Sequence, residues 1–413
     1  MFNFEQFVAK RLTHDDTEKC DFTLTPFIVK IAIISIALSV TIMIISISVG
    51  VGIQDKIREK VSELFGHIQI TAYENIDTYT TSSISKDQVF YPDIKKLNVE
   101  GVTSIQAYCY KAGIIKNDKT FEGVILKGVD SIYNFSFLEK YLQEGHIPRY
   151  TEEYNDSVLI SSYIAKNLEL KLGDKFNMFF LRKNKTPIVR IFKVSGIFKT
   201  DFSDYDKTFV FADIKHVQRL NKWKQNEISG FEVFIDDFDK LDEIGLKVYK
   251  GIGADLNSTT IAEKQRFIID WIKLFDINIA VILIIMILVS GVNMVTVLII
   301  LILERIKFIA VMKTIGCNNS TLRRIFFFKS TYIILRGLIF GNIIGIGLLL
   351  AQSYFEVIDL NPDIYYVDTI PISFNLYHVF LVNISTMFFC LLLMFFPTYM
   401  ISKVNPMKIL RFD

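Results

Sequence analysis

Metal-binding and disulfide patterns are missing from this sequence of 413 residues. It has four cysteines and five histidines, but no Cys-x-x-Cys and no His-x-x-x-His pair. The cysteines are Cys20, Cys109, Cys317 and Cys390. Such scattered residues are not typical of a metal centre, so we expect none. The topology argued below places no two cysteines in one oxidising compartment, so we expect no disulfide.

Signatures of catalysis are missing as well. There is no Gly-x-x-x-x-Gly-Lys-[Ser/Thr] phosphate loop and no Gly-x-Ser-x-Gly nucleophile turn. The long apolar runs hold no acidic pair that could relay protons. Asp201, Asp204 and Asp206 are expected to be solvated loop residues. The sequence therefore predicts a chain that catalyses no reaction alone, so energy for any work has to enter through a partner.

Neither sign of charge is in excess, because 46 Lys and Arg face 44 Asp and Glu. No basic stripe with interleaved aromatic residues stands out, which argues against a nucleic-acid partner. Hydrophobic residues make up 51% of the chain and the mean hydropathy is +0.35. This balance indicates a membrane protein.

Four apolar runs are long enough to cross a bilayer as helices. Ile31–Ile53 and Ile277–Leu303 contain 23 and 27 residues without a charge. The third and fourth cover about Ile333–Tyr354 and Tyr377–Ile401. Apolar residues continue at helical spacing beyond the first run, through Ile57, Val61 and Leu64, so that helix should project past the membrane.

A basic segment, Glu304–Lys329, separates the second and third runs. Its six basic residues are Arg305, Lys307, Lys313, Arg323, Arg324 and Lys329. By the positive-inside rule it should lie in the cytoplasm. Gly316 can end one helix and Asn319 or Ser320 can cap the next, which predicts helix, tight turn, helix. The loop Gln352–Leu376 has acidic residues and no Lys or Arg, so it should lie outside, with both termini inside.

The stretch 65–265 has no run long enough to span a membrane. It alternates short β-type patterns with helical ones, bounded by Gly, Asn, Asp or Pro. The expected strands are His67–Tyr73, Ser104–Tyr110, Thr120–Lys127, Asp156–Ile160, Lys175–Leu181, Pro187–Phe198, Lys207–Phe211 and Gly230–Ile235. The sequence thus predicts an α-helical membrane protein with four transmembrane helices and a large α+β extracytoplasmic domain between helices 1 and 2.

The expected boundaries follow from these patterns. They are a cytoplasmic segment at 1–25, helix 1 and its extension at 26–64, the α+β domain at 65–265, helix 2 at 266–303, the cytoplasmic coupling segment at 304–329, helix 3 at 330–355, an outer loop at 356–376, helix 4 at 377–402 and a cytoplasmic tail at 403–413.

Several stretches resemble one family. The passage Asn293–Arg324, NMVTVLIILILERIKFIAVMKTIGCNNSTLRR, is similar to the signature of four-helix ABC permeases of the lipoprotein-releasing (LolC/LolE-like) and MacB/FtsX-like kind. Leu159–Lys175 and Phe192–Phe211 look like the MacB-like periplasmic core domain of the lipoprotein-releasing permeases. Pro397–Arg411, with two prolines nine residues apart, looks like the closing pattern of the family.

The resemblance implies the partners and the coupling residues. Residues expected to couple to a cytoplasmic ATPase are Glu304, Arg305, Lys307, Ile309, Ala310, Lys313 and Gly316. It implies a dimer of ATPase subunits that bind ATP and magnesium, no cofactor on this chain, and a second permease subunit, identical or a sister chain. It also implies a lipoprotein substrate, a periplasmic chaperone, membrane lipids and the bacterial inner membrane. The hairpin tip Arg182–Thr186 is shorter than the hook that one subunit type uses to grip the chaperone.

Two faces of the membrane helices are candidates for function. Val40, Met43, Ile44 and Ile47 share one face of the first span, and the resemblance implies that they line a cavity for lipid chains. Packing against lipid is the alternative for this face. Gly337, Gly341 and Gly345 share one face of the third span, where another helix can approach closely. Arg336 should extend its charge to the membrane surface.

The expected function is therefore that of a non-catalytic permease subunit in an ATP-driven transporter that releases lipoproteins. The alternative in the same superfamily is mechanotransmission, in which the chain drives efflux or activates a cell-wall hydrolase. A signalling receptor would need a cytoplasmic output module, and the expected cytoplasmic segments are too short for one.

Overall fold

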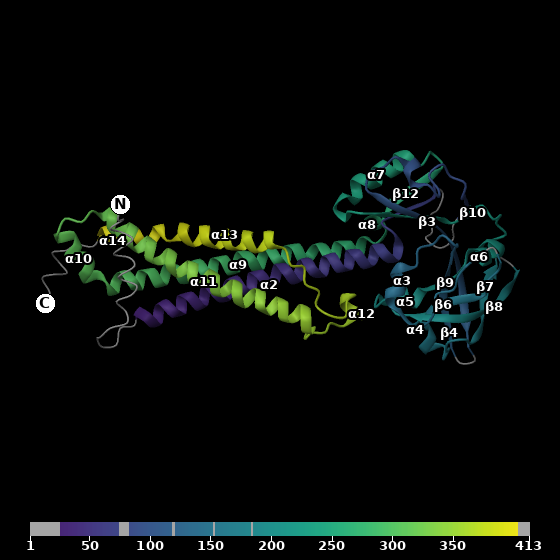
Figure 1. Cartoon of the computed structure of the whole chain (residues 1–413), viewed down its shortest axis with the longest axis horizontal. Coiled ribbons are helices and arrows are strands. Elements are labelled where there is room, and N and C mark those ends of the chain that lie inside the picture. Colours follow the sequence, from purple (N-terminus) through teal and green to yellow (C-terminus); the bar gives the residue numbers. More distant parts are fainter. Residues whose placement is uncertain (1–24, 74–81, 118–119, 152, 183–184, 404–413) are drawn as a thin grey trace. The chain divides into compact units, whose positions relative to one another are not determined.

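The computed structural model describes residues 25–73, 82–117, 120–151, 153–182 and 185–403 (Figure 1). The chain divides into two compact units. The helical unit contains residues 1–54, 273–359 and 370–413, and the sheet unit contains residues 55–272 and 360–369. The predicted N-terminal segment and tail lie almost wholly outside the described residues.

Four long apolar helices are present where the uncharged runs predicted them. They are α2 (Thr25–Phe65), α9 (Arg266–Glu304), α11 (Asn319–Phe355) and α13 (Leu376–Leu393), which α14 (Phe395–Lys403) continues. The first three are each longer than a bilayer requires. Ile57, Val61 and Leu64 are fully buried, so α2 does continue past the uncharged run, as their spacing predicted.

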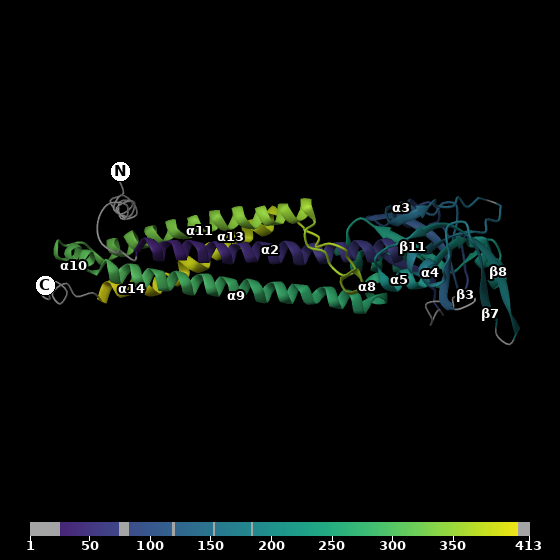
Figure 2. The ribbon, with the colours of Figure 1, turned by 90° about the horizontal axis from the view of Figure 1, so that it is seen from below.

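The helical unit, whose long helices lie side by side in Figure 2, is held together by apolar packing and by a few polar pairs. Thr41 Oγ1 on α2 donates to the Gly341 carbonyl on α11 at 3.1 Å. Asn342 on α11 and Asn383 on α13 exchange two side-chain hydrogen bonds of 2.7 and 2.9 Å. Asn293 on α9 donates to Ser35 on α2. Polar groups in an apolar interior need partners, so these bonds fix which helix faces meet.

One mixed sheet organises the sheet unit. Its order is β12-β1-β11-β3-β4-β9-β6-β8-β5, with β7 paired to β3 and β8. The strands are β1 (Ile68–Ala72), β3 (Val102–Lys116), β4 (Phe121–Val129), β5 (Leu142–Gly145), β6 (Ser157–Ser161), β7 (Lys175–Arg182), β8 (Lys185–Phe198), β9 (Phe209–Asp213), β11 (Gly230–Ile235) and β12 (Leu256–Thr260). Most neighbours are antiparallel, while β4–β9 and β6–β8 are parallel. A separate two-stranded sheet joins β2 (Ile84–Ser85) to β10 (Glu227–Ile228).

Short helices connect the strands. They are η2 (Ile94–Leu97), α3 (Ser136–Tyr141), α4 (Ser162–Asn167), α5 (Ser203–Thr208), α6 (Ile214–Asn221), η3 (Phe238–Lys240), α7 (Leu241–Gly251), α8 (Ile261–Lys264) and, from the C-terminal half, α12 (Pro362–Tyr365). Helix α6 packs on β3 and β4. Its amphipathic pattern explains this, because Ile214, Val217 and Leu220 are buried at helical spacing.

The predicted fold class is confirmed. Each of the eight expected strands overlaps an observed one, whereas β2, β5, β10 and β12 were not predicted. Strands β7 and β8 pair antiparallel from Lys175 to Lys193, as the hairpin prediction required. Two residues at the hairpin tip, 183 and 184, lie outside the described residues.

Candidate functional site

The segment between α9 and α11 forms a helix and a tight turn, as the sequence predicted. Glu304 ends α9, and α10 runs over Ile306–Thr314. Gly316 has a φ of +95°, a conformation that side chains with a Cβ rarely adopt. The cap of α11 is Asn318, which accepts the backbone N–H of Ser320 at 3.4 Å. The prediction of Asn319 or Ser320 as the cap was therefore wrong, because both residues already lie in the first turn of α11. The turn is therefore specified locally by a glycine and a capping residue.

Helix α10 has a buried face and an exposed one. Ile309 and Ala310 are fully buried, and Ile309 belongs to the core of the helical unit. Val311 and Ile315, in contrast, are 43% and 77% exposed. Two of the predicted coupling residues therefore hold α10 in place. Val311 and Ile315 are the apolar residues that a partner could contact, and sequence reasoning missed both.

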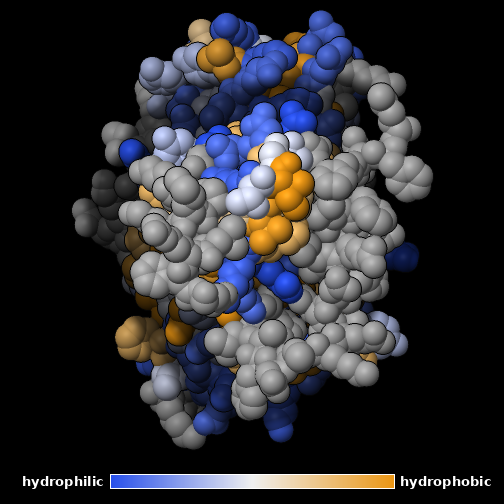
Figure 3. Space-filling view, turned by 90° about the vertical axis from the view of Figure 1, so that its left-hand side faces the viewer, coloured by the Kyte–Doolittle hydropathy of each residue, from blue (hydrophilic) through white to orange (hydrophobic). Residues whose placement is uncertain are grey.

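Basic side chains accompany this exposed apolar tip, here defined as Val311, Ile315 and Gly316. Lys307 is exposed and Lys313 is half-buried, and burial lowers the pKa of Lys313. The Arg323 guanidinium lies 5.4 Å from the ring centroid of Tyr399 on α14. Figure 3 looks onto the end of the helical unit where α10 lies and shows a small hydrophobic patch with hydrophilic surface above and below it. An apolar centre with a polar rim is the usual composition of a docking surface.

The glycine face of α11 lies against α2. A Cβ at Gly337 would come within 2.7 Å of Ile36 Cβ, and one at Gly341 within 2.8 Å of the Ala37 carbonyl oxygen. A Cβ at Gly345 would meet ordinary van der Waals contacts, at 3.4 Å from Thr41 Cα. Gly337, Gly341 and Gly345 meet Ile36, Ala37 and Thr41 in that order, which shows that α11 and α2 run parallel. We call this contact the glycine seam.

The four residues predicted to line a lipid cavity lie in the core of the helical unit. Val40, Met43, Ile44 and Ile47 are all buried by the chain's own helices. Val40 and Ile44 pack at the glycine seam. Their predicted contact with lipid chains therefore requires a state in which these helices separate, and it stays a prediction.

A buried ion pair lies at the C-terminal end of α2, within the sheet unit. Lys127 on β4 and Glu232 on β11 form a 2.7 Å ion pair, and both side chains are 0% exposed. Tyr110 and Tyr133 donate to the carboxylate at 3.4 and 3.3 Å. Burial lowers the pKa of Lys127, and the Glu232 carboxylate opposes that shift. Lys127 also donates to the Leu64 carbonyl at 3.5 Å, so it places a cation at the negative end of the helix.

The last turn of α2 is fixed by further contacts. The Phe65 ring makes edge contacts with Phe202, Tyr205 and Phe209, with centroid distances of 6.2, 5.2 and 5.9 Å. Gln69 donates to the Phe65 carbonyl at 2.7 Å. Aromatic packing and carbonyl capping together anchor the end of α2 in the sheet unit.

Gln69 also reaches the residues that lead into α9. Its side-chain oxygen accepts from Lys264, the last residue of α8, just before α9 begins at Arg266. Burial lowers the pKa of Lys264 to about 8. We call Gln69, Lys127, Glu232 and Lys264 the anchor cluster. It joins the end of the first long helix to the start of the second through one sheet. Sequence reasoning missed it, although Lys127 and Glu232 each interrupt an apolar strand pattern.

The expectation that Asp201, Asp204 and Asp206 are solvated is wrong for two of the three. Asp206 is buried rather than solvated, because its carboxylate accepts from the Thr200 backbone N–H at 3.1 Å and from the Thr200 hydroxyl at 2.7 Å. Desolvation raises the pKa of Asp206 to about 6. Asp204 is exposed, as expected, whereas the Asp201 side chain is only 10% exposed and pairs with Lys199.

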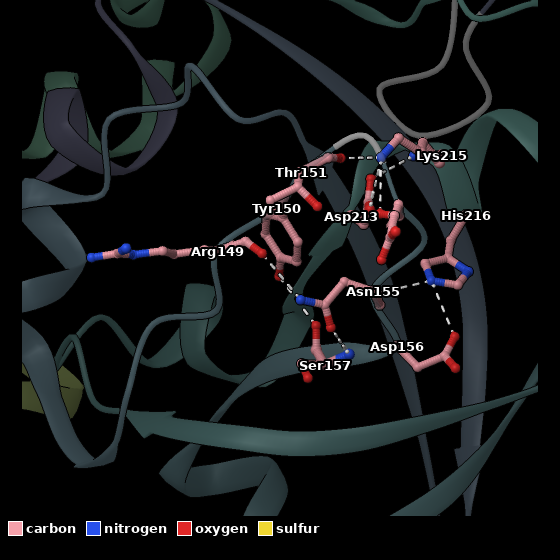
Figure 4. Close-up of polar contacts among 10 residues, drawn as sticks. Arg149, Tyr150, Thr151, Asn155, Asp156, Ser157, Asp213, Lys215 and His216 are labelled. Atoms are coloured by element: carbon pink, nitrogen blue, oxygen red, sulfur yellow. Dashed lines mark hydrogen bonds and ion pairs between the residues drawn. The ribbon is translucent and has the colours of Figure 1, made fainter.

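Polar residues between β5 and β6 hold their loop against α6 (Figure 4). His216 Nε2 contacts the Asn155 carbonyl at 3.0 Å and Asp156 at 3.3 Å. Lys215 contacts the carbonyls of Thr151 and Glu153. Most of the partners are backbone carbonyls, so this group fixes a loop and shows no nucleophile activated by a base. Among the described residues no cluster of metal-ligating side chains is found.

Among the described residues, four apolar helices long enough to cross a membrane and a separate sheet unit define a class, that of a helical membrane protein with a large folded domain. Comparison with known families assigns it more closely. Residues 31–246 match the MacB-like periplasmic core domain, and residues 280–406 match the FtsX-like permease C-terminal region. The first match covers more than half of the chain. The chain therefore belongs to the MacB/FtsX-like family of ABC transporter permeases.

Several relatives resemble the chain over most of its length. An uncharacterized membrane protein of Buchnera aphidicola (subsp. Schizaphis graminum) is 26% identical over 99% of both chains. The lipoprotein-releasing system transmembrane protein LolE of Haemophilus influenzae is 23% identical over 94% of this chain and 95% of its own. LolC of the same Buchnera is 23% identical over 93% of both. Among solved structures, the periplasmic region of MacB from Actinobacillus actinomycetemcomitans covers 50% of this chain and 95% of its own, at 15% identity and a TM-score of 0.33.

Proposed function

We propose that this chain is a permease subunit of an ATP-driven transporter that releases lipoproteins from the outer leaflet of the bacterial inner membrane for sorting to the outer membrane. The observation that carries the proposal is the similarity to LolE and LolC, which extends over 94% and 93% of this chain. Similarity over that length includes both the helical unit and the sheet unit.

The proposed orientation places α10, both termini and the basic segment in the cytoplasm, and the sheet unit outside. A dimer of ABC ATPase subunits then binds the exposed apolar tip. It holds the ATP and magnesium, so this chain carries no cofactor. A second permease, identical or a sister chain, completes the transporter. The LolC and LolE relatives support a partner of the same fold.

Energetics support a path in which lipid chains stay buried. Each acyl CH₂ that leaves the bilayer for water costs about 0.8 kcal/mol, so several long chains would cost tens of kcal/mol. A transporter therefore has to offer apolar surface during release. The predicted cavity residues on α2 could provide it if α2 moves away from α11, and the anchor cluster would link such movement to the sheet unit.

Reconstitution tests the proposal. The chain is purified with its ATPase and sister permease, placed in proteoliposomes that carry a triacylated lipoprotein, and supplied with ATP and a soluble lipoprotein chaperone. We expect ATP-dependent transfer of the lipoprotein to the chaperone. In Ile315→Ser, which removes the most exposed apolar residue of the tip, both ATPase binding and transfer should fall.

A matched control is Val357→Ser, which removes an equally exposed apolar side chain (71% exposed) from the loop after α11. It should leave both activities unchanged. If both variants lose ATPase binding and lipoprotein transfer to the same extent, the tip is not the ATPase contact. ATP hydrolysis without transfer would contradict the lipoprotein proposal for the substrate used.

The anchor cluster favours mechanotransmission as a second candidate. It joins α2 and the start of α9 to one sheet, so movement of those helices would reach the sheet unit even if no substrate passes between them. Under this candidate, ATP would change the exposure of the sheet unit to protease in the reconstituted complex, and the lipoprotein would stay in the vesicles.

A further inference from the structure

An apolar groove lies on the outer surface of the α2–α11 pair in the helical unit. Its volume is about 600 Å³. Ile34 and Leu38 line it from α2, and Phe340, Ile344 and Leu348 line it from α11. These five side chains are 49–63% exposed, so the chain itself leaves them uncovered. The glycine seam lies beside this groove, because Gly341 meets Ala37, a further lining residue.

Two cations lie at one end of the groove. Lys30 precedes Ile34 by one helical turn, and Arg336 precedes Phe340 by one turn. Because α2 and α11 run parallel in this register, both charges fall at the same end. Both side chains are exposed, and within the described ranges neither forms an ion pair. The Arg336 guanidinium stacks 4.4 Å from the Tyr332 ring, an aromatic partner typical of the membrane surface.

The dimensions fit one leaflet of a bilayer. Twelve residues separate Arg336 from Leu348, which is about 18 Å of helix. One leaflet has about 15 Å of hydrocarbon, half of the usual 30 Å. Lys30 lies just before the uncharged run that starts at Ile31, so the cationic end is at the headgroup level. The apolar end then reaches the middle of the bilayer.

We propose that this groove binds an anionic phospholipid, with its acyl chain along Ile34, Leu38, Phe340 and Ile344 and its headgroup between Lys30 and Arg336. Charge complementarity selects the occupant. A zwitterionic headgroup carries its own cation, which the two basic side chains repel, whereas an anionic headgroup is attracted by both. If the chain has the orientation given under the proposed function, the lipid comes from the cytoplasmic leaflet. Only this choice of leaflet rests on the proposed function.

This site is separate from the proposed path of the lipoprotein. That substrate leaves from the outer leaflet, whereas both cations mark the opposite end of the helices. A lipid in the groove covers the apolar surface of α2 and α11 next to the glycine seam. It should therefore stabilise that helix pair, since a ligand that binds only the folded form shifts unfolding in its favour.

Native mass spectrometry of the purified full chain tests the proposal. The protein is extracted in mild detergent and titrated with phosphatidylglycerol or, separately, with phosphatidylethanolamine of the same acyl chains. We expect one phosphatidylglycerol to stay bound preferentially. The double variant Lys30→Gln, Arg336→Gln should weaken that binding by about 30-fold, since each basic side chain contributes about 1 kcal/mol. The matched control Lys247→Gln, Lys250→Gln, which removes two charges from α7 in the sheet unit, should bind like the wild type.

A second variant separates a groove from a general attraction of charges. Ile344→Trp fills the groove and keeps both cations, so it should also lose the lipid. Retention in Ile344→Trp, equal binding of the two lipids, or unchanged binding in the double charge variant would each overturn the proposal. The proposal would also be overturned if the sister permease occupies the groove. A cysteine substituted for Leu38 would then cross-link to the sister permease in the complete transporter. None of these readouts needs ATP or lipoprotein, so failure of the proposed function is distinguished from failure here.

Discussion

Lys127 and Glu232 share a buried site in which both side chains are 0% exposed, so each charge depends on the other. A buried ion pair contributes little net stability compared with apolar residues of the same size, but removal of one partner leaves a charge that the interior cannot solvate. The same logic explains the hydrogen bonds from Tyr110 and Tyr133, each of which satisfies a further oxygen lone pair of the carboxylate.

We predict that Glu232→Gln lowers the free energy of unfolding of the sheet unit by about 3–5 kcal/mol. The double variant Lys127→Met, Glu232→Leu should lose much less, because it leaves no buried charge. Both tryptophans, Trp223 and Trp271, lie in the sheet unit, so denaturant titration of the full chain in detergent, followed by tryptophan fluorescence, measures the change. A double variant less stable than Glu232→Gln would contradict this account.

His67 should make the sheet unit sensitive to acid. Burial lowers its pKa to about 4 from an ordinary 6.5, and its Nδ1 accepts the Ile235 N–H at 3.4 Å. Above pH 6.5 the ring is neutral in both states. As the pH falls from 6.5 to 4, only the unfolded chain takes up the proton, so up to about 3 kcal/mol of stability is lost. His67→Asn, which keeps an acceptor, should remove that part of the pH dependence in the same fluorescence titration.

Asp206 should act in the opposite direction. Its pKa is raised from 3.8 to about 6, so its contribution to stability is full below pH 3.8 and is lost as the pH rises through 6. Asp206→Asn should therefore gain stability relative to the wild type as the pH rises from 4 to 7. A parallel pH profile for the variant and the wild type would show that the carboxyl does not titrate in this range.

Few of these residues could be predicted from the sequence. Lys127 and Glu232 lie on strands separated by β3, and their pairing depends on a sheet order that no local pattern reveals. Asp206 lies in a segment whose polar composition is typical of a solvated loop. Only its contacts with Thr200 show that its carboxylate is buried. The exposure of Ile315 is seen only in the structure.

At the scale of elements, the glycine seam decides how closely α11 approaches α2. We predict that Gly341→Val destabilises the helical unit by about 1–3 kcal/mol, because its Cβ would meet backbone atoms of Ala37 that cannot move aside. A Cβ at Gly347 on the same helix would have no atom within 4 Å, so Gly347→Ala is the matched control. It should be neutral or gain up to about 1 kcal/mol from helix propensity.

Unfolding in a sodium dodecyl sulfate titration, followed by circular dichroism, measures both glycine variants. Loss of stability in Gly347→Ala equal to that in Gly341→Val would mean that the losses come from the helix itself and not from its contact with α2.

Elements were more predictable than single residues. Long uncharged runs specify membrane helices because every backbone polar group in lipid has to be bonded within the helix. The longer strands could also be predicted locally, because their β-branched and aromatic residues favour an extended backbone. The strands that were missed are short, and β5 and β12 are polar, as LQEG and LNSTT. Their pairing with β8 and β1 creates them, and that is tertiary information.

For the whole molecule, the anchor cluster holds the end of α2 and the residues that lead into α9 on one sheet. We predict that Gln69→Leu, which removes the bonds to the Phe65 carbonyl and to Lys264, lowers lipoprotein release per ATP hydrolysed while ATPase activity remains. Gln106→Leu is the matched control. Gln106 is a buried glutamine of the same sheet that accepts from Asn134 and makes no bond to α2 or Lys264.

The reconstituted transporter measures both quantities in one assay. If Gln69→Leu keeps the wild-type ratio of release to hydrolysis, then the cluster serves stability alone. If both variants lower the ratio equally, the loss comes from a weakened sheet and not from the junction.

The glycine seam also has a genetic consequence. Every single-base change that replaces a glycine by another amino acid introduces a side chain with a Cβ, because no other residue lacks one. At Gly337 and Gly341 no replacement of smaller size exists, so this chain has no neutral amino-acid replacement at those positions unless α2 changes first. Random mutagenesis under selection for a working transporter should keep glycine at these two positions, through silent codon changes alone, long after Gly347 has varied.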